Sequence, residues 1–310
     1  MRLSPSRYRQ VTVVALGLLI AIVITGAAVR LTGSGLGCDD WPNCNDERFV
    51  DVSSGHAAIE QVNRLFTGLV AVAVIAAVLG SLVRPPRRRD LTWLSLGLVA
   101  GVVAQVVLGG FTVLVDLHPL AVQGHLLLSM VLVATAVILV RRAGEPDDAA
   151  RHSTVTTTSR RLTWALATGT TLAIVTGTVV TGAGPHAGDE EAQRFAVDIS
   201  SAARIHGATV IVTLLLGLAI AILLRRDGAD RRALQRPLEL WIFIGALQAA
   251  IGYTQYFNEI PALLVAVHVA GATALWAITV WLVTSTSATT TPVARDGRAA
   301  SSGLVGSATA

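Results

Sequence analysis

The feature of this sequence that most limits its possible folds is a series of long apolar stretches separated by short charged ones. Eight such stretches lie near residues 11–29, 62–83, 92–110, 119–140, 162–182, 204–224, 238–257 and 262–284. Each is close to the ~20 residues that a helix needs to cross a ~30 Å hydrocarbon core. Only 14% of the 310 residues are charged, against roughly a quarter in ordinary soluble domains. The sequence therefore predicts an all-α membrane protein with eight transmembrane helices.

The arginine residues indicate how these stretches are oriented. The chain contains 24 basic residues, none of which is lysine. With the N-terminus inside, 19 of the 24 arginines fall in cytoplasmic segments and 5 in outer loops. The positive-inside rule therefore predicts that both termini are cytoplasmic. Because the charge is spread over several loops, we expect no nucleic-acid partner. The stretch at 11–29 follows a basic N-terminus, as a cleaved signal peptide does, but we expect it to be retained.

The two halves of the chain repeat one pattern. A shift of 143 residues superimposes four pairs of residues: Gln105 and Gln248, Gly109 and Gly252, His125 and His268, and Asn63 and His206. Each copy has four spans, so we predict two tandem four-helix bundles related by pseudo-two-fold symmetry. The predicted domains are an N-terminal half (1–140), a polar cytoplasmic linker (141–161), a C-terminal half (162–284) and a disordered cytoplasmic tail (285–310).

Four polar residues occupy equivalent depths in this repeat: Asn63, His125, His206 and His268. Each lies in roughly the first two turns of a helix that runs inward, which is within about 10 Å of the outer surface. Polar residues inside a membrane helix are costly and usually functional, and imidazole is a common axial ligand of heme iron. We therefore expect His206 and His268 to ligate one heme. The alternative is that each histidine only hydrogen-bonds to a neighbouring helix.

The first half differs from the second in its ligands, because His125 faces Asn63, which is a poor ligand of iron. The second half could hold a six-coordinate heme that passes electrons. The first half could leave an iron position open, or hold a heme that is itself the substrate. His118 lies on the same helix face as His125, about two turns further out. It could contact a heme propionate or act as an alternative ligand.

The first outer loop contains the only two cysteines of the chain, Cys38 and Cys44. On the oxidising side of a membrane, two thiols this close in sequence can form a disulfide. The bond could be a structural staple worth ~2–3 kcal/mol by the loop-closure estimate. It could also be a redox-active pair that exchanges electrons near the heme site. We favour the staple and leave the redox role open.

A carboxylate, Glu60, lies three residues before Asn63 on the same helix face, and Arg64 follows four residues later. The two charges could form a surface ion pair that contributes little. Alternatively, Glu60 lies beside the heme of the first half, where it could transfer a proton or stabilise a developing positive charge. The shift of 143 residues places Ala203 at the equivalent position. The carboxylate is therefore specific to the half with the weaker ligand pair, which favours the functional role.

Several of these segments together resemble the heme A synthase family. They are residues 30–44 (RLTGSGLGCDDWPNC), Glu60-x-x-Asn63-Arg64, His118-Pro119 with His125, residues 181–189 (TGAGPHAGD), and His206 with His268. The resemblance extends from about residue 10 to 284, and its most specific part is the loop that contains both cysteines. The family pattern most often has histidine where this chain has Asn63.

The resemblance implies a function and a set of site residues. Members of the family oxidise the C8 methyl of heme O to a formyl by successive hydroxylations, giving heme A for terminal oxidases. They are eight-helix membrane proteins with heme b as cofactor in the C-terminal half and the substrate heme in the N-terminal half. By position, His206 and His268 would ligate heme b, and His125 would ligate the substrate heme. Glu60 would be the catalytic carboxylate, and Cys38 and Cys44 would be the cysteine pair of the loop. Asn63, Arg64 and His118 would line the substrate pocket.

Partners and competing functions follow from the same residues. The expected partners are heme O as substrate, membrane lipid, heme O synthase and an electron donor. A non-catalytic di-heme or quinol-linked electron-transfer protein would also need paired histidines. That alternative does not explain why Glu60 accompanies the weaker ligand pair. A transporter would have ionisable residues near the bilayer midplane, where this sequence has almost none.

Overall fold

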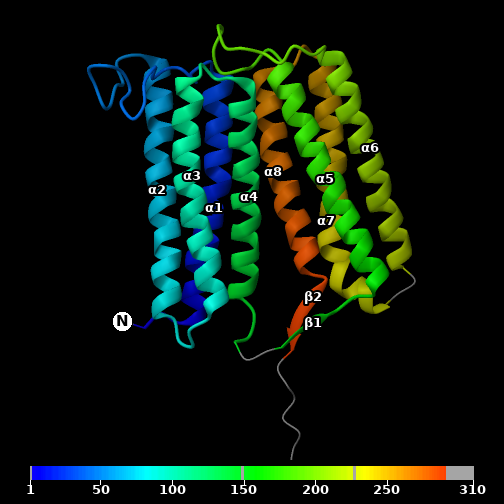
Figure 1. The fold of residues 1–310 in the computed structure, drawn as a ribbon. Helices are drawn as coiled ribbons and strands as arrows, with labels where there is room; N and C mark the ends of the chain where they lie inside the picture. Colours follow the sequence, from blue (N-terminus) through cyan, green and yellow to red (C-terminus); the bar gives the residue numbers. More distant parts are fainter. Residues whose placement is uncertain (1, 148–149, 226–227, 291–310) are drawn as a thin grey trace, which may run out of the picture.

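The computed structural model describes residues 2–147, 150–225 and 228–290, most of which lie in helices (Figure 1). The described helices are α1 Pro5–Leu31, α2 Gly55–Val83, α3 Arg89–Leu114, α4 Pro119–Ala143, α5 Thr157–Ala183, α6 Ile199–Leu224, α7 Gly228–Phe257 and α8 Ala262–Thr284. Two short strands accompany them, β1 Ala150–Ser153 and β2 Ser287–Thr290. Every apolar stretch predicted to span the membrane lies within one of these helices.

Seven of the described helices are long and apolar enough to cross a membrane, by length and composition. The exception is α7, because Glu239, Gln248 and Gln255 interrupt its apolar part. Nevertheless, α7 packs against α6 and α8 and runs alongside them (Figure 1). The protein is therefore an all-α membrane protein, as the sequence predicted.

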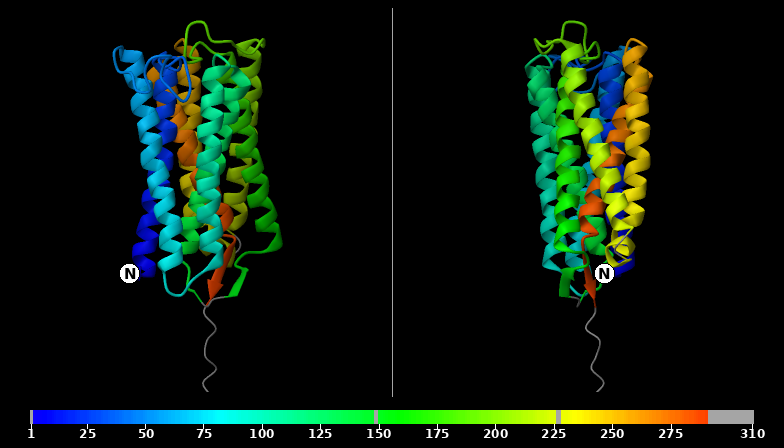
Figure 2. Two further views of the ribbon diagram at one scale, coloured as in Figure 1. Left: turned by 60° about the vertical axis from the view of Figure 1, so that its left-hand side comes forward. Right: turned by 90° about the vertical axis from the view of Figure 1, so that its right-hand side faces the viewer.

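The helices form two groups of four that lie side by side (Figures 1 and 2). In the first group each helix packs against the next, and α4 closes the ring on α1. Helices α5 to α8 form a second ring in the same way, and α8 joins the two groups by packing on α1 and α4. At this junction the indole Nε1 of Trp276 donates a hydrogen bond of 2.7 Å to the carbonyl oxygen of Met130. The pseudo-two-fold relation between the groups stays a prediction.

The helices that carry the predicted ligands begin at capping side chains. The Ser54 hydroxyl accepts a hydrogen bond from the backbone N–H of Ala57 at the start of α2. The Asp198 carboxylate does the same for Ser201 at the start of α6, with a length of 2.8 Å. Such caps satisfy N–H groups that the first helical turn leaves without partners. They fix where each helix begins, and so the depth of the residues that follow.

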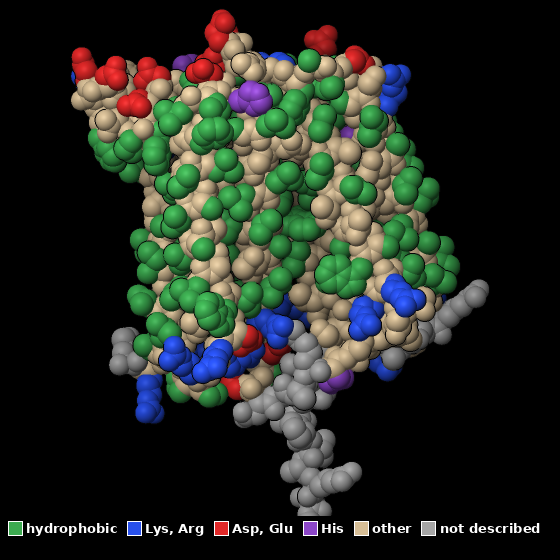
Figure 3. Space-filling view, in the orientation of Figure 1, with side chains coloured by type: hydrophobic (Ala, Val, Ile, Leu, Met, Phe, Trp, Pro, Cys, Tyr) green, Lys and Arg blue, Asp and Glu red, His purple; other side chains and the backbone are tan. Residues whose placement is uncertain are grey.

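The two ends of the molecule differ in charge. Asp and Glu side chains gather at the end that carries the loop of residues 32–54, and arginines gather at the end of the N-terminus (Figure 3). We call residues 32–54 the cysteine loop, and the end where it lies the cysteine-loop end. A belt rich in hydrophobic side chains separates the two charged ends (Figure 3). This pattern is typical of a protein whose two ends face different aqueous compartments.

The strands β1 and β2 pair antiparallel at the N-terminal end, with Arg151 opposite Thr289 (Figure 1). The sequence did not predict this pairing, and the prediction of a disordered tail over 285–310 is wrong for residues 287–290. The reason is that the linker and the start of the tail lie at the same end of the molecule, where their backbones can hydrogen-bond. Residues 291–310 lie outside the described part of the chain.

Candidate functional site

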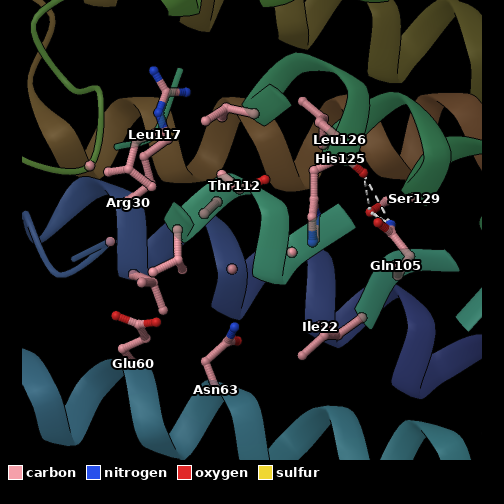
Figure 4. A pocket seen from close by; sticks show the side chains of 18 of the residues that line it. Ile22, Arg30, Glu60, Asn63, Gln105, Thr112, Leu117, His125, Leu126 and Ser129 are labelled. Atoms are coloured by element: carbon pink, nitrogen blue, oxygen red, sulfur yellow. Dashed lines mark hydrogen bonds between the residues drawn. The ribbon is translucent and has the colours of Figure 1, made fainter. Parts of the chain in front are cut away.

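The first cavity has a volume of about 570 Å³ and lies among α1 to α4. This volume is within the range of roughly 300–1,000 Å³ for small-molecule and cofactor sites. His125 of α4 and Asn63 of α2 enter it from opposite walls, and Glu60 lies beside Asn63 (Figure 4). The cavity therefore collects these three residues and Arg64, which the sequence also singled out.

The His125 imidazole points across the cavity toward α2 (Figure 4). A Cβ atom at Gly109 would stand 3.0 Å from Nε2 of His125, so glycine leaves the ring its space. Gln105 supports the same turn of helix, because its Nε2 donates to the carbonyl oxygen of His125 at 3.0 Å and to Ser129 Oγ at 2.5 Å. No hydrogen bond joins the His125 ring to another described residue. A ring held in this way has a nitrogen lone pair available for a metal.

Asn63 is held by a neighbour on α1. The Thr25 hydroxyl donates a hydrogen bond of 2.8 Å to Oδ1 of Asn63. The amide N–H groups of Asn63 form no hydrogen bond with the rest of the described chain. They can therefore donate to a ligand in the cavity, whereas an amide nitrogen has no lone pair to offer to iron.

Glu60 is buried, with an exposed fraction of 6%, and its two oxygens have different partners. Oε1 accepts from Arg64 Nη2 at 2.7 Å and from Arg64 Nε at 3.0 Å, while Oε2 accepts from the backbone N–H of Cys38 at 2.8 Å. Arg64 also donates to the carbonyl oxygens of Asp40 and Asn43. The Glu60–Arg64 pair therefore ties α2 to the cysteine loop as well as lining the cavity.

The predicted disulfide between Cys38 and Cys44 is present, and both side chains are buried with exposed fractions of 1%. The loop that it closes covers the first cavity with Trp41, whose indole lies where a Cβ atom at Gly110 would be. Burial of both sulfurs and the direct contact of Cys38 with Glu60 agree with a structural staple.

The second cavity has a volume of about 490 Å³ and lies among α5 to α8. His206 of α6 and His268 of α8 line it, with ring centroids 6.4 Å apart and ring planes at 85°. Because a metal–imidazole bond is about 2 Å long, two rings that share one metal have centroids roughly 6–6.5 Å apart. The spacing of the two imidazoles therefore fits one metal ion between them.

The hydrogen bonds of these rings also fit a metal site. Thr176 Oγ1 lies 3.2 Å from Nδ1 of His206, which leaves Nε2 of that ring for a ligand. Such a bond to the non-ligating nitrogen is typical of metal-bound histidine. Nδ1 of His268 is buried and has no hydrogen-bond partner in the described residues. A buried polar atom without a partner costs about 1–3 kcal/mol, and a bound group that turned or ligated this ring would remove that cost.

The remaining histidines lie outside both cavities. His118, which the sequence placed near the substrate, does not line either cavity; its Nδ1 accepts from the backbone N–H of Leu120 and so caps α4. His186 Nε2 lies 2.8 Å from the carbonyl oxygen of Ile260. His56 Nδ1 lies 2.9 Å from Ser34 Oγ. These three side chains hold loops and helix ends in place.

Sequence reasoning missed three features of the cavities: the Thr25–Asn63 contact, its counterpart Thr176–His206, and Arg30 in the wall of the first cavity. The first two had a signal in the sequence, because Thr-Gly occurs at 25–26 and again at 176–177. Arg30 had none beyond being one of the few arginines of the outer loops.

Residues 9–58 and 49–280 match the family model described as "Cytochrome oxidase assembly protein". The chain belongs to this family. Among similar proteins, the "Heme A synthase" of Listeria monocytogenes is 30% identical over 167 residues, which cover 52% of this chain and 54% of that protein. The "Heme A synthase" of Bacillus pumilus is 29% identical over 133 residues, covering 42% and 43%. The chain thus spans about half the length of these curated relatives.

Proposed function

We propose that this protein is a heme A synthase, which oxidises the C8 methyl of heme O to a formyl by successive hydroxylations. One observation carries the proposal: the chain has two cavities with equivalent histidines, and only one of them adds a buried carboxylate beside a weaker ligand pair. Family membership and the relatives named heme A synthase agree with it. A di-heme electron carrier needs no such difference between its two sites.

In this proposal the second cavity holds heme b between His206 and His268. These two imidazoles would hold the heme iron, and heme held by two imidazoles would supply one-electron chemistry. Thr176 orients the His206 ring through Nδ1. The apolar walls of the cavity, including Trp241 and Leu275, keep water from the ligands.

The first cavity would bind heme O as substrate, with His125 as its ligand. Gln105 and Gly109 hold that ring in position. The Glu60 carboxylate faces the same space (Figure 4) and is kept in place by Arg64 and Cys38. There it can accept a proton at an oxygen or stabilise positive charge that develops on the methyl carbon. Cys38 and Cys44 act as a structural staple of the loop that covers this cavity.

The proposed topology puts both termini in the cytoplasm and both heme sites toward the outer face of the cell membrane. Arginines gather at the N-terminal end (Figure 3), which supports this orientation. Each of Asn63, His125, His206 and His268 lies six to eight residues from the start of its helix, at the cysteine-loop end. Heme O synthase and a membrane electron donor are the proposed partners.

The test is to co-express the full chain with a source of heme O, extract the hemes and separate them by chromatography. We expect heme A, and none when His125 is replaced by alanine. Cells with the heme O source alone are the control. If the purified protein carries heme in both cavities and forms neither heme A nor a hydroxylated heme, the synthase is excluded and the di-heme electron carrier takes its place.

A further inference from the structure

Arg30 lies in the last turn of α1, in the wall of the first cavity at its cysteine-loop end. Its side chain is mostly buried and extends away from Glu60 and Asn63 (Figure 4). Nη2 donates a hydrogen bond of 2.7 Å to the carbonyl oxygen of Thr181, near the end of α5. The cation therefore faces the negative ends of two helix dipoles, which explains part of its stability there.

The helix ends leave most of the guanidinium without partners. Nε of Arg30 is buried and has no hydrogen-bond partner in the described residues, and Nη1 forms no hydrogen bond with them. No carboxylate of the described chain forms an ion pair with Arg30. Arg194 lies close enough to repel it and is likewise without a carboxylate partner among those residues. A buried charge is costly unless an opposite charge pairs with it. We therefore expect an anion to bind beside Arg30.

The other arginine of the first cavity cannot bind that anion. Arg64 already forms two bonds with the Glu60 carboxylate and two more with backbone carbonyls of the cysteine loop. Its charge is therefore balanced, and four of its five N–H donors are used. Arg30 is therefore the arginine in the cavity wall that still has free N–H donors and an unpaired positive charge for an anion.

The far end of the same cavity is apolar. Leu19, Val70, Val102 and Leu132 line it and are buried. Along α1, Leu19 and Arg30 are eleven residues apart, which is about 16 Å of helix. The cavity thus has one cationic end and one hydrocarbon end, with His125 between them. A flat amphipathic ligand with carboxylates on one edge matches this polarity.

We propose that Arg30 is the carboxylate-binding residue of the first cavity, and that it fixes the substrate heme with its propionates toward the cysteine-loop end. The inference rests on the proposed function, since it needs a carboxylate-bearing heme in this cavity. The Arg30 fork binds a propionate by charge-assisted hydrogen bonds. It thereby sets which edge of the macrocycle faces Glu60 and which faces the apolar end. Arg30 is a binding and positioning residue with no part in proton transfer.

The test compares two ligands with the same macrocycle, one with free propionates and one with both propionates esterified. Full-length protein with heme b in the second cavity is titrated in detergent with hemin and with hemin dimethyl ester, and binding is followed by absorbance. We expect the wild type to prefer hemin. Arg30→Gln should weaken hemin binding roughly 10- to 100-fold and leave the diester affinity nearly unchanged. Arg30→Lys, which keeps the charge without the fork, should retain part of the preference.

Arg48→Gln is the matched control, because Arg48 lies at the same cysteine-loop end, lines neither cavity and pairs with Asp51. It should change neither titration, and an unchanged heme b spectrum shows that each variant is folded. Equal affinity of the wild type for both ligands would overturn the proposal, and so would an equal loss of both in Arg30→Gln. Heme A formation separates the two proposals. A chain that prefers hemin but forms no heme A contradicts only the synthase, whereas heme A formation without the preference contradicts only the role of Arg30.

Discussion

In the second cavity, the hydroxyl of Thr176 on α5 lies 3.2 Å from Nδ1 of His206. In the first cavity, the hydroxyl of Thr25 on α1 lies 2.8 Å from the amide oxygen of Asn63. Facing them, Gly252 and Gly109 make room for His268 and His125. The two sites thus share these threonine and glycine contacts, and one ligand is exchanged. The comparison teaches that the repeat supplies the same framework twice, and that a single side chain decides whether a cavity offers two imidazoles or one.

The largest effect is expected from removing a ligand of the second cavity. His206→Ala or His268→Ala should abolish the low-spin heme b signal, because no third histidine lines the cavity. Absorbance and electron paramagnetic resonance spectra of the purified protein measure this. If His125→Ala removed that signal instead, the assignment of the two cavities would be reversed.

Exchanging the one ligand that differs tests the comparison directly. Asn63→His should close the open axial position of the first cavity, and His206→Asn should open one in the second. In reduced protein, carbon monoxide binding should then be lost from the first site of Asn63→His and gained by His206→Asn. Heme A formation should fall sharply in His206→Asn, which removes a ligand of the proposed heme b site. Unchanged carbon monoxide binding in both variants would show that Asn63 and His206 do not face the iron.

The second difference between the cavities is the carboxylate. Glu60→Gln keeps the size of the side chain and should lower heme A formation by roughly 10²- to 10⁴-fold, with the heme content unchanged. Glu47→Gln changes an exposed carboxylate of the cysteine loop and should have no effect. Full activity of Glu60→Gln would mean that Glu60 only ties α2 to Cys38.

Particular residues show what the sequence could predict. The apolar stretches predicted all eight helices, because length and hydropathy report the membrane directly. The repeat predicted the depth of Asn63, His125, His206 and His268, since equal offsets on helices give equal heights. The sequence could not predict contacts that depend on loop conformation or on backbone atoms. The bond from Cys38 to Glu60 depends on the loop conformation, and that from Arg30 to Thr181 joins residues 151 positions apart.

A smaller effect is expected at the cysteine loop, which covers the first cavity. Replacing Cys38 and Cys44 together by serine should lower the free energy of unfolding by about 2 kcal/mol, because the closed loop is short. Heme A formation by the folded variant should stay near that of the wild type. Thermal unfolding in detergent and the heme assay measure the two quantities. Loss of activity without loss of stability would instead favour a redox role for the pair.

The smallest effect concerns the start of α6, the helix that carries His206. Hydrogen bonds from Ser200 and Ser201 lower the pKa of the exposed Asp198 carboxyl to about 2. Because the pKa in the unfolded chain is near 4, the ionised carboxylate stabilises the folded state at pH above about 4. That contribution is lost as the pH falls from about 4 to about 2. Asp198→Ala should therefore lower the unfolding temperature slightly at pH 7 and not at all near pH 2. Ser54 caps α2 with a hydroxyl that does not titrate in this range, so Ser54→Ala should lower the unfolding temperature equally at both pH values. A pH-independent effect of Asp198→Ala would show that the charge of its carboxylate does not stabilise α6.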